Sequence, residues 1–140
     1  MTRKSSCISL FCVVFFISCE AFSQTAAETA AEDSATKWLA LVDAGDYAGS
    51  WEEAAPFFKN AVSKEQWVKQ LTAVRGPLGK LISRKLKSAT YRTSLPGAPD
   101  GQYVVIQYDS TFEHKTSAVE TVTPMLSKDG QWRVSGYFIR

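Results

Sequence analysis

The stretch that decides the fold is VETVTPMLSKDGQWRVSGYFI, residues 119–139. The dipeptide Asp129-Gly130 in its middle favours a tight hairpin turn, and the residues on both sides are rich in β-branched and aromatic side chains. We therefore expect antiparallel strands over residues 116–127 and 131–140. Alternation over residues 103–112 and β-compatible residues over 81–93 predict two further strands, so the chain should end in a four-stranded antiparallel sheet.

The residues before this sheet have helical rather than strand spacing. Apolar side chains recur at helical intervals from Ala31 until Gly45, and again from Asp46 until Pro56 must kink or end the second helix. A third helix should start at Ser63, where Ser63 and Gln66 form a capping-box pattern. The predicted fold class is α+β, with three N-terminal helices packed on a bent four-stranded antiparallel sheet.

The N-terminus has the pattern of an export signal. Two basic residues precede a largely apolar run over residues 7–18, and small residues stand at Ala21 and Ser23. We predict a signal peptide over residues 1–23, a flexible segment over 24–34 and one domain over 35–140. The product would be periplasmic or secreted. A net charge of +2 over 140 residues does not favour nucleic acid as a partner.

An alternative processing event centres on Cys19. The sequence Phe-Ile-Ser-Cys at 16–19 is similar to a bacterial lipobox, so Cys19 is a candidate lipidation site, and only then would the protein sit on a membrane. All three cysteines lie in or beside the export segment. The domain should therefore have no disulfide or thiol nucleophile, and with a single histidine we expect no metal site and no cofactor.

Two-residue turns at His114-Lys115 and Asp129-Gly130 would set the strand register. In that register Asp109 lies directly opposite Glu120, and two carboxylates so placed repel each other. One interpretation is an acidic catalytic pair with one member protonated. The other is a polar patch in which Lys85, Lys87 or, if a bulge shifts the strand over residues 81–93, Arg84 compensates the two carboxylates. In that case Glu120→Gln would be tolerated.

The same register sorts the strands into two faces. Tyr108 and Trp132 fall on the apolar face that the helices should cover, and they are the candidate ligand-binding side chains. The opposite face mixes polar residues with apolar ones that are too many to leave in water on a monomer. These apolar residues are Val105, Val122, Leu126, Tyr137 and Ile139. We therefore expect a homodimer formed through the sheet.

Three segments support a family resemblance: residues 101–109 (GQYVVIQYD), 119–126 (VETVTPML) and 129–139 (DGQWRVSGYFI). They resemble the small exported bacterial proteins grouped as domain of unknown function 4019, and the helices followed by a bent sheet resemble the nuclear-transport-factor-2-like, or cystatin-like, cone. The resemblance implies a cone domain in the bacterial envelope and no particular activity.

The sequence therefore favours a non-catalytic ligand-binding or assembly module of the periplasm, with an unknown small molecule or envelope protein as its partner. Two alternatives stay open. One is a small isomerase or hydrolase with an acidic site in the cone, and the other is a lipid-anchored envelope component.

Overall fold

The computed structural model describes residues 19–140, so most of the predicted signal peptide lies outside the described residues. Helices come first and strands follow, which confirms the α+β class. The helices are α1 (Cys19–Asp43), α2 (Tyr47–Glu52), α3 (Pro56–Ala61) and α4 (Lys64–Arg75), and the strands are β1 (Leu81–Arg92), β2 (Tyr103–Phe112), β3 (Lys115–Leu126) and β4 (Trp132–Ile139). None of the helices in this described part is long and apolar enough to cross a membrane.

The helix boundaries follow from local chemistry. Pro56 divides the predicted second helix into α2 and α3, because proline fits the first turn of a helix but interrupts its interior. Ser63 and Gln66 form the predicted capping box at the start of α4, in which each side chain accepts a hydrogen bond from the other residue's backbone N–H. Helix α1 already covers residues 24–34, and from residue 23 onward its first fully buried side chain is Ala31.

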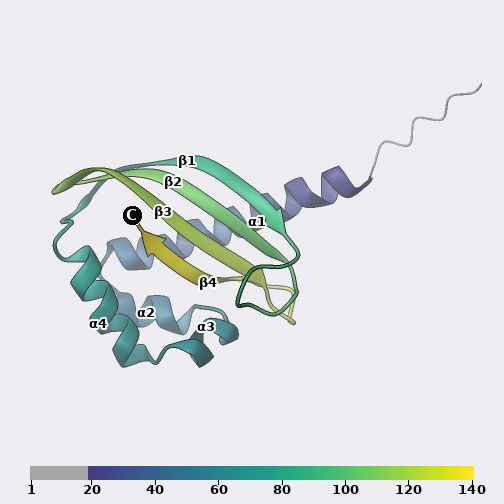
Figure 1. Ribbon diagram of the computed structural model, residues 1–140, viewed down its shortest axis with the longest axis horizontal. Helices are drawn as coiled ribbons and strands as arrows, with labels where there is room; N and C mark the ends of the chain where they lie inside the picture. Colours follow the sequence, from purple (N-terminus) through teal and green to yellow (C-terminus); the bar gives the residue numbers. More distant parts are fainter. Residues whose placement is uncertain (1–18) are drawn as a thin grey trace, which may run out of the picture.

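The four strands form one antiparallel sheet in the order β1-β2-β3-β4. Figure 1 shows α1 lying along one face of this sheet, with α2, α3 and α4 grouped beside it and the N-terminal end of α1 extending away. Helix α1 contacts all four strands, whereas α4 packs mainly on α2. We call the sheet face toward α1 the inner face and the opposite one the outer face.

The register between β2 and β3 differs from the predicted one by a residue. Phe112 pairs with Lys115, so the turn is Glu113-His114 and not His114-Lys115. This turn alone would shift the pairing by two residues, but a register irregularity between Ser110 and Phe112 reduces the shift to one. Glu120 therefore lies opposite Tyr108 on the inner face, and Asp109 lies opposite Val119 on the outer face. The predicted Asp109–Glu120 pairing is therefore wrong, because a one-residue slip moves every side chain of a strand to the other face.

The β3–β4 hairpin also departs from the prediction. The Ser127 backbone N–H donates to the Gln131 carbonyl, and within this turn Gly130 alone has a positive φ, of 81°. This is a three-residue turn with a left-handed glycine, not the predicted two-residue turn, which requires two positive φ angles. A register shift after Thr123, at Pro124, then restores the predicted pairing further along, consistent with the missing N–H of proline.

Together these shifts reassign the faces of β3 and β4. Val122 is fully buried in the core and Tyr137 packs against it, although both were expected on the mixed face. Phe138, expected among the apolar residues under the helices, is 52% exposed. Leu126 and Ile139 also share the strand face of Glu120, so the argument for a dimer through the outer face loses Val122, Leu126, Tyr137 and Ile139 and gains Phe138.

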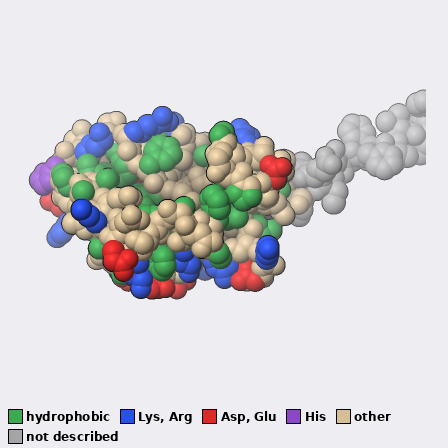
Figure 2. All heavy atoms as spheres, turned by 60° about the horizontal axis from the view of Figure 1, so that its bottom comes forward, with side chains coloured by type: hydrophobic (Ala, Val, Ile, Leu, Met, Phe, Trp, Pro, Cys, Tyr) green, Lys and Arg blue, Asp and Glu red, His purple; other side chains and the backbone are tan. Residues whose placement is uncertain are grey.

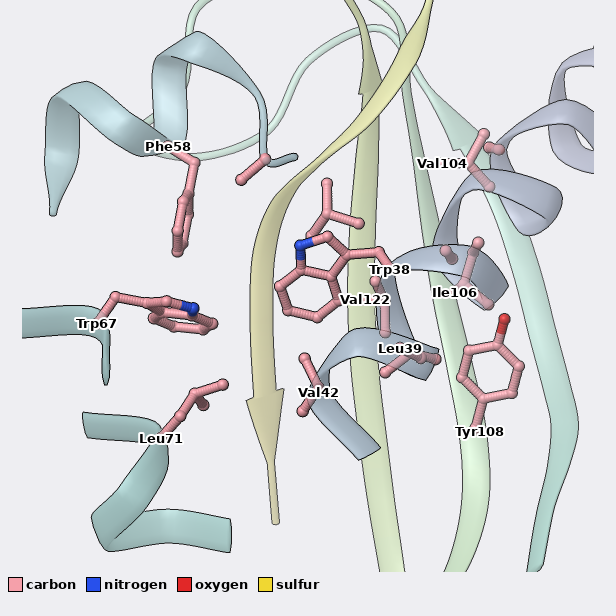
Figure 3. Close-up of a cluster of buried hydrophobic side chains, with 14 residues drawn as sticks. Trp38, Leu39, Val42, Phe58, Trp67, Leu71, Val104, Ile106, Tyr108 and Val122 are labelled. Carbon is pink, nitrogen blue, oxygen red and sulfur yellow. The ribbon is translucent and has the colours of Figure 1, made fainter. Parts of the chain in front are cut away.

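The core is built around aromatic side chains between the inner face and the helices. In Figure 3 the side chains Trp38, Leu39 and Val42 of α1 lie in the middle of the core. On one side of them are the strand residues Val104, Ile106 and Val122, and on the other are Phe58, Trp67 and Leu71 of the later helices. The indole N–H of Trp38 donates to the Ser50 carbonyl at 2.7 Å, and that of Trp67 donates to the Ser50 hydroxyl at 3.0 Å. These bonds satisfy two polar groups that would otherwise be costly to bury.

Candidate functional site

Glu120 is the centre of the most unusual polar cluster in the described domain. Its side chain is fully buried, and it is the only buried carboxylate among residues 23–140. Oε1 accepts from the Arg84 Nε at 2.7 Å and from the Ser110 hydroxyl at 2.6 Å. Oε2 accepts from the Arg84 Nη2 at 3.1 Å and from the Tyr137 hydroxyl at 2.5 Å. Four donors therefore occupy the two carboxylate oxygens.

The cluster continues through Arg84 to the end of α1. Arg84 Nη1 and Nη2 donate to the two oxygens of Asp43 at 2.7 and 3.0 Å, and Arg75 Nη2 donates to Asp43 Oδ1 at 3.0 Å. We call Asp43, Arg75, Arg84, Ser110, Glu120 and Tyr137 the buried ionic network. Two carboxylates face two guanidinium groups, so its formal charge is zero. Its members come from α1, α4 and all four strands.

The strand irregularities explain how Arg84 reaches Glu120. Register shifts in β1 lie between Leu81 and Ser83 and between Leu86 and Ser88, and Arg84 lies opposite Ser110 between them. The alternative in which a bulge brings Arg84 to Glu120 is thus the one observed. Asp109, on the outer face, has its own cation, with Lys87 Nζ 3.6 Å from Oδ1.

Burial and charge shift the pKa values of the network in opposite directions. Burial of Asp43 by itself raises the pKa of this carboxyl, but the hydrogen bonds and charges of Arg84 and then Arg75 outweigh burial and hold the pKa below its usual value. Burial, and next the charge of Glu120, raise the pKa of the Tyr137 hydroxyl. Asp43 therefore stays ionised and Tyr137 stays protonated over the whole neutral range.

This arrangement suits structure better than proton transfer. A general base needs a free lone pair within reach of a substrate proton, whereas Glu120 is inaccessible and its acceptor positions are taken. Arg75 is only 5% exposed, and its Nε and Nη1 have no hydrogen-bond partner among the described residues. Its guanidinium carbon lies 4.9 Å from the centre of the Phe112 ring, which gives it a cation–π contact instead.

Sequence reasoning missed most of this network. It named Glu120 and offered Arg84 as one of several partners, but it did not name Arg75. In the structure Arg75 is buried. The strict i+4 series Trp67, Leu71, Arg75 is the signal that could have placed Arg75 on the buried side.

The two candidate ligand-binding residues do not share a site. Tyr108 is buried in the core, where burial raises the pKa of its hydroxyl. Trp132 instead lines a groove of about 490 Å³ between α1 and the β3–β4 hairpin. We call this the polar groove, and its charged and polar lining side chains are Asp33, Ser34, Lys37, Glu53, Gln131 and Arg133.

A second groove lies on the other side of Arg133, between α3 and the same hairpin. Its volume is about 650 Å³, and we call it the apolar groove. It is lined by Ala54, Pro56, Phe57, Lys59, Met125, Leu126, Ser127, Lys128, Asp129 and Arg133. Figure 2 turns the α2–α4 side toward the reader and shows hydrophobic, basic and acidic side chains interspersed over that surface.

Two other residues named from the sequence can be placed briefly. Helix α1 begins at Cys19, the candidate lipidation site. His114 is exposed in the β2–β3 turn, where its backbone N–H donates to the Leu78 carbonyl at 3.0 Å. Within the described residues 19–140, no group of three His, Cys, Asp or Glu side chains is arranged to hold a metal ion.

Comparison with known proteins gives one match. The family model described as "Protein of unknown function (DUF4019)" matches residues 34–137. No curated protein and no solved structure matches the chain. The nuclear-transport-factor-2-like cone therefore stays a prediction, while the helices followed by an antiparallel four-stranded sheet are observed.

Proposed function

Because the chain belongs to the DUF4019 family, whose description assigns no activity, we propose its function from its own geometry: it is a non-catalytic ligand-binding domain of the bacterial envelope. The observation that carries the proposal is the state of Glu120. The one buried carboxylate of the described domain is bound to four donors, and the space between α1 and the sheet is filled by core side chains. Binding therefore belongs to the two surface grooves beside the β3–β4 hairpin.

The grooves suit reversible binding of small molecules. Volumes of about 490 and 650 Å³ lie within the range of roughly 300–1,000 Å³ that is common for ligand pockets. In the polar groove the side chains of Asp33 and Lys37 make no hydrogen bond or ion pair with any residue of 23–140, so their polar atoms are available to a ligand. The hairpin that separates the grooves is fixed by the ion pair between Arg133 and Asp129, 2.8 Å long.

Amide chemical-shift mapping on the 24–140 chain tests this proposal. A library of small envelope metabolites should shift the amides of Lys37, Trp132 or Leu126 around the grooves and leave those of Arg84 and Glu120 in place. A turnover activity that Glu120→Gln abolishes in a folded protein would instead establish the alternative of a small isomerase or hydrolase.

Export completes the proposed function. It is supported by the basic residues at 3 and 4, the apolar run over 7–18 and the small residues at 21 and 23. Intact-mass measurement of the product from the envelope should give an N-terminus at Gln24. A diacylated Cys19 would instead support the lipid-anchored alternative.

Self-association is a second candidate function, favoured by the exposed ring of Phe138 on the outer face. Pairing two outer faces would remove this ring from water. Light scattering coupled to size exclusion should then give a dimer that Phe138→Ser dissociates, whereas a monomer at tens of micromolar would rule it out.

A further inference from the structure

The apolar groove carries an inference about ligand class, and this inference rests on the proposed binding function. Its floor is apolar on both sides: Pro56 and Phe57 come from the first turn of α3, and Met125 and Leu126 are the last residues of β3. All four are partly or fully accessible at the surface. A flexible hydrocarbon chain is a ligand that would cover such a floor without leaving polar atoms unpaired.

The rim of the apolar groove is cationic, and its charged groups differ in availability. Arg133 donates to both oxygens of Asp129 at 2.9 and 2.8 Å, so these two charges compensate each other. Hydrogen bonds from Arg133 and from the Gln131 N–H lower the pKa of Asp129 to about 2, which keeps this pair ionised at neutral pH. Lys59 and Lys128 then give the rim a net positive charge.

Lys128 is the free cation of this rim. The Lys59 ammonium donates to the Glu52 carbonyl at 2.7 Å and lies 5.5 Å from the centre of the Trp51 ring. Lys128 makes no hydrogen bond or ion pair with any described residue, and it is exposed beside Leu126 at the start of the hairpin turn. An anionic group at the end of a hydrocarbon chain could therefore reach Lys128 while the chain covers the groove floor.

We propose that the apolar groove binds a free monoacyl amphipathic anion, such as a medium-chain fatty acid. The alkyl chain lies against Phe57, Met125 and Leu126, and the carboxylate pairs with Lys128. A cationic amphiphile is disfavoured because it would meet the same positive rim. A sugar or another polyol is disfavoured because it would leave the apolar floor without a matching surface.

The test is a titration of the 24–140 protein with decanoate below its micelle concentration, followed by amide chemical shifts. The shifts should centre on Phe57, Met125 and Leu126. Lys128→Glu should weaken the affinity about fivefold, because it replaces the attraction of an exposed charge pair by a repulsion. Lys69→Glu is the matched control: it makes the same charge change at an exposed position of α4 outside the groove, and it should leave the affinity unchanged.

Two further arms separate the groove from nonspecific association. Decyltrimethylammonium has the same chain length with a cationic head, and it should bind the wild type more weakly than decanoate. Phe57→Ser should weaken decanoate binding because it removes part of the floor and leaves the charged rim in place. Equal effects of Lys128→Glu and Lys69→Glu, or binding to anionic phospholipid vesicles without any binding of decanoate, would overturn the proposal.

Failure of this inference can be told apart from failure of the proposed function. If decanoate does not bind but metabolites shift the amides of Lys37 and Trp132, the ligand belongs to the polar groove and the binding function stands. If neither groove responds to any small molecule, the proposed function fails together with the inference.

Discussion

Replacing Glu120 by glutamine should destabilise the protein strongly. Glutamine has the same shape but no charge, so the buried ionic network would be left with Arg75 and Arg84 against Asp43 alone. Whichever way the amide turns, its NH₂ group replaces an oxygen that accepts an Arg84 N–H, because Arg84 donates to both carboxylate oxygens. Breaking a buried ion pair by removing one partner costs about 3–5 kcal/mol. Since Asp43 still holds Arg84, we expect the lower end, about 3 kcal/mol.

The assay is urea and thermal unfolding of the 24–140 protein, followed by tryptophan fluorescence. A loss of about 3 kcal/mol should lower the melting temperature by roughly 12 °C for a domain of this size. The matched control is Asp109→Asn, the equivalent change at an exposed pair with Lys87, which should stay within about 0.5 kcal/mol of the wild type. The register with Asp109 opposite Glu120 predicts instead that Glu120→Gln is tolerated. A loss below about 1 kcal/mol, or equal losses in both variants, would refute the network as a source of stability.

Three further changes test other parts of the structure. The folded-state pKa of Asp43 lies below its unfolded value, so its contribution to stability is present above about pH 4 and is lost as the pH falls through the folded pKa. In urea unfolding between about pH 5 and pH 2, Asp43→Asn should therefore lose less unfolding free energy with falling pH than the wild type. An equal pH dependence in the two proteins would contradict this. Tyr137→Phe removes a hydroxyl that donates to buried Glu120 and should cost about 1.5–3 kcal/mol in urea unfolding. Because folding raises the pKa of Tyr137, the stability that this hydroxyl contributes is lost only at alkaline pH. A variant as stable as the wild type at neutral pH would therefore argue against the hydrogen bond. Ser63→Ala removes the acceptor that caps α4 and should cost about 1 kcal/mol, whereas Ser63→Asp should retain most of the stability.

Features that depend only on neighbouring residues could be predicted from the sequence. The capping box of Ser63 and Gln66, the break at Pro56 and the bounds of β2 are local, because turns, caps and alternation act over a few positions. The membership of the family was also visible in the sequence, in the motifs over residues 101–139.

Which distant residues contact each other depends on the tertiary packing. The turn at Glu113-His114 and the register irregularity between Ser110 and Phe112 together moved Glu120 from the outer face to the inner one, and no local pattern predicts either of them. Arg75 and Arg84 then converge on the carboxylates of Asp43 and Glu120 from a helix and a bulged strand that are distant in sequence. Likewise the two grooves exist only because the β3–β4 hairpin lies between α1 and α3, so their lining depends on how the elements pack rather than on spacing along the chain.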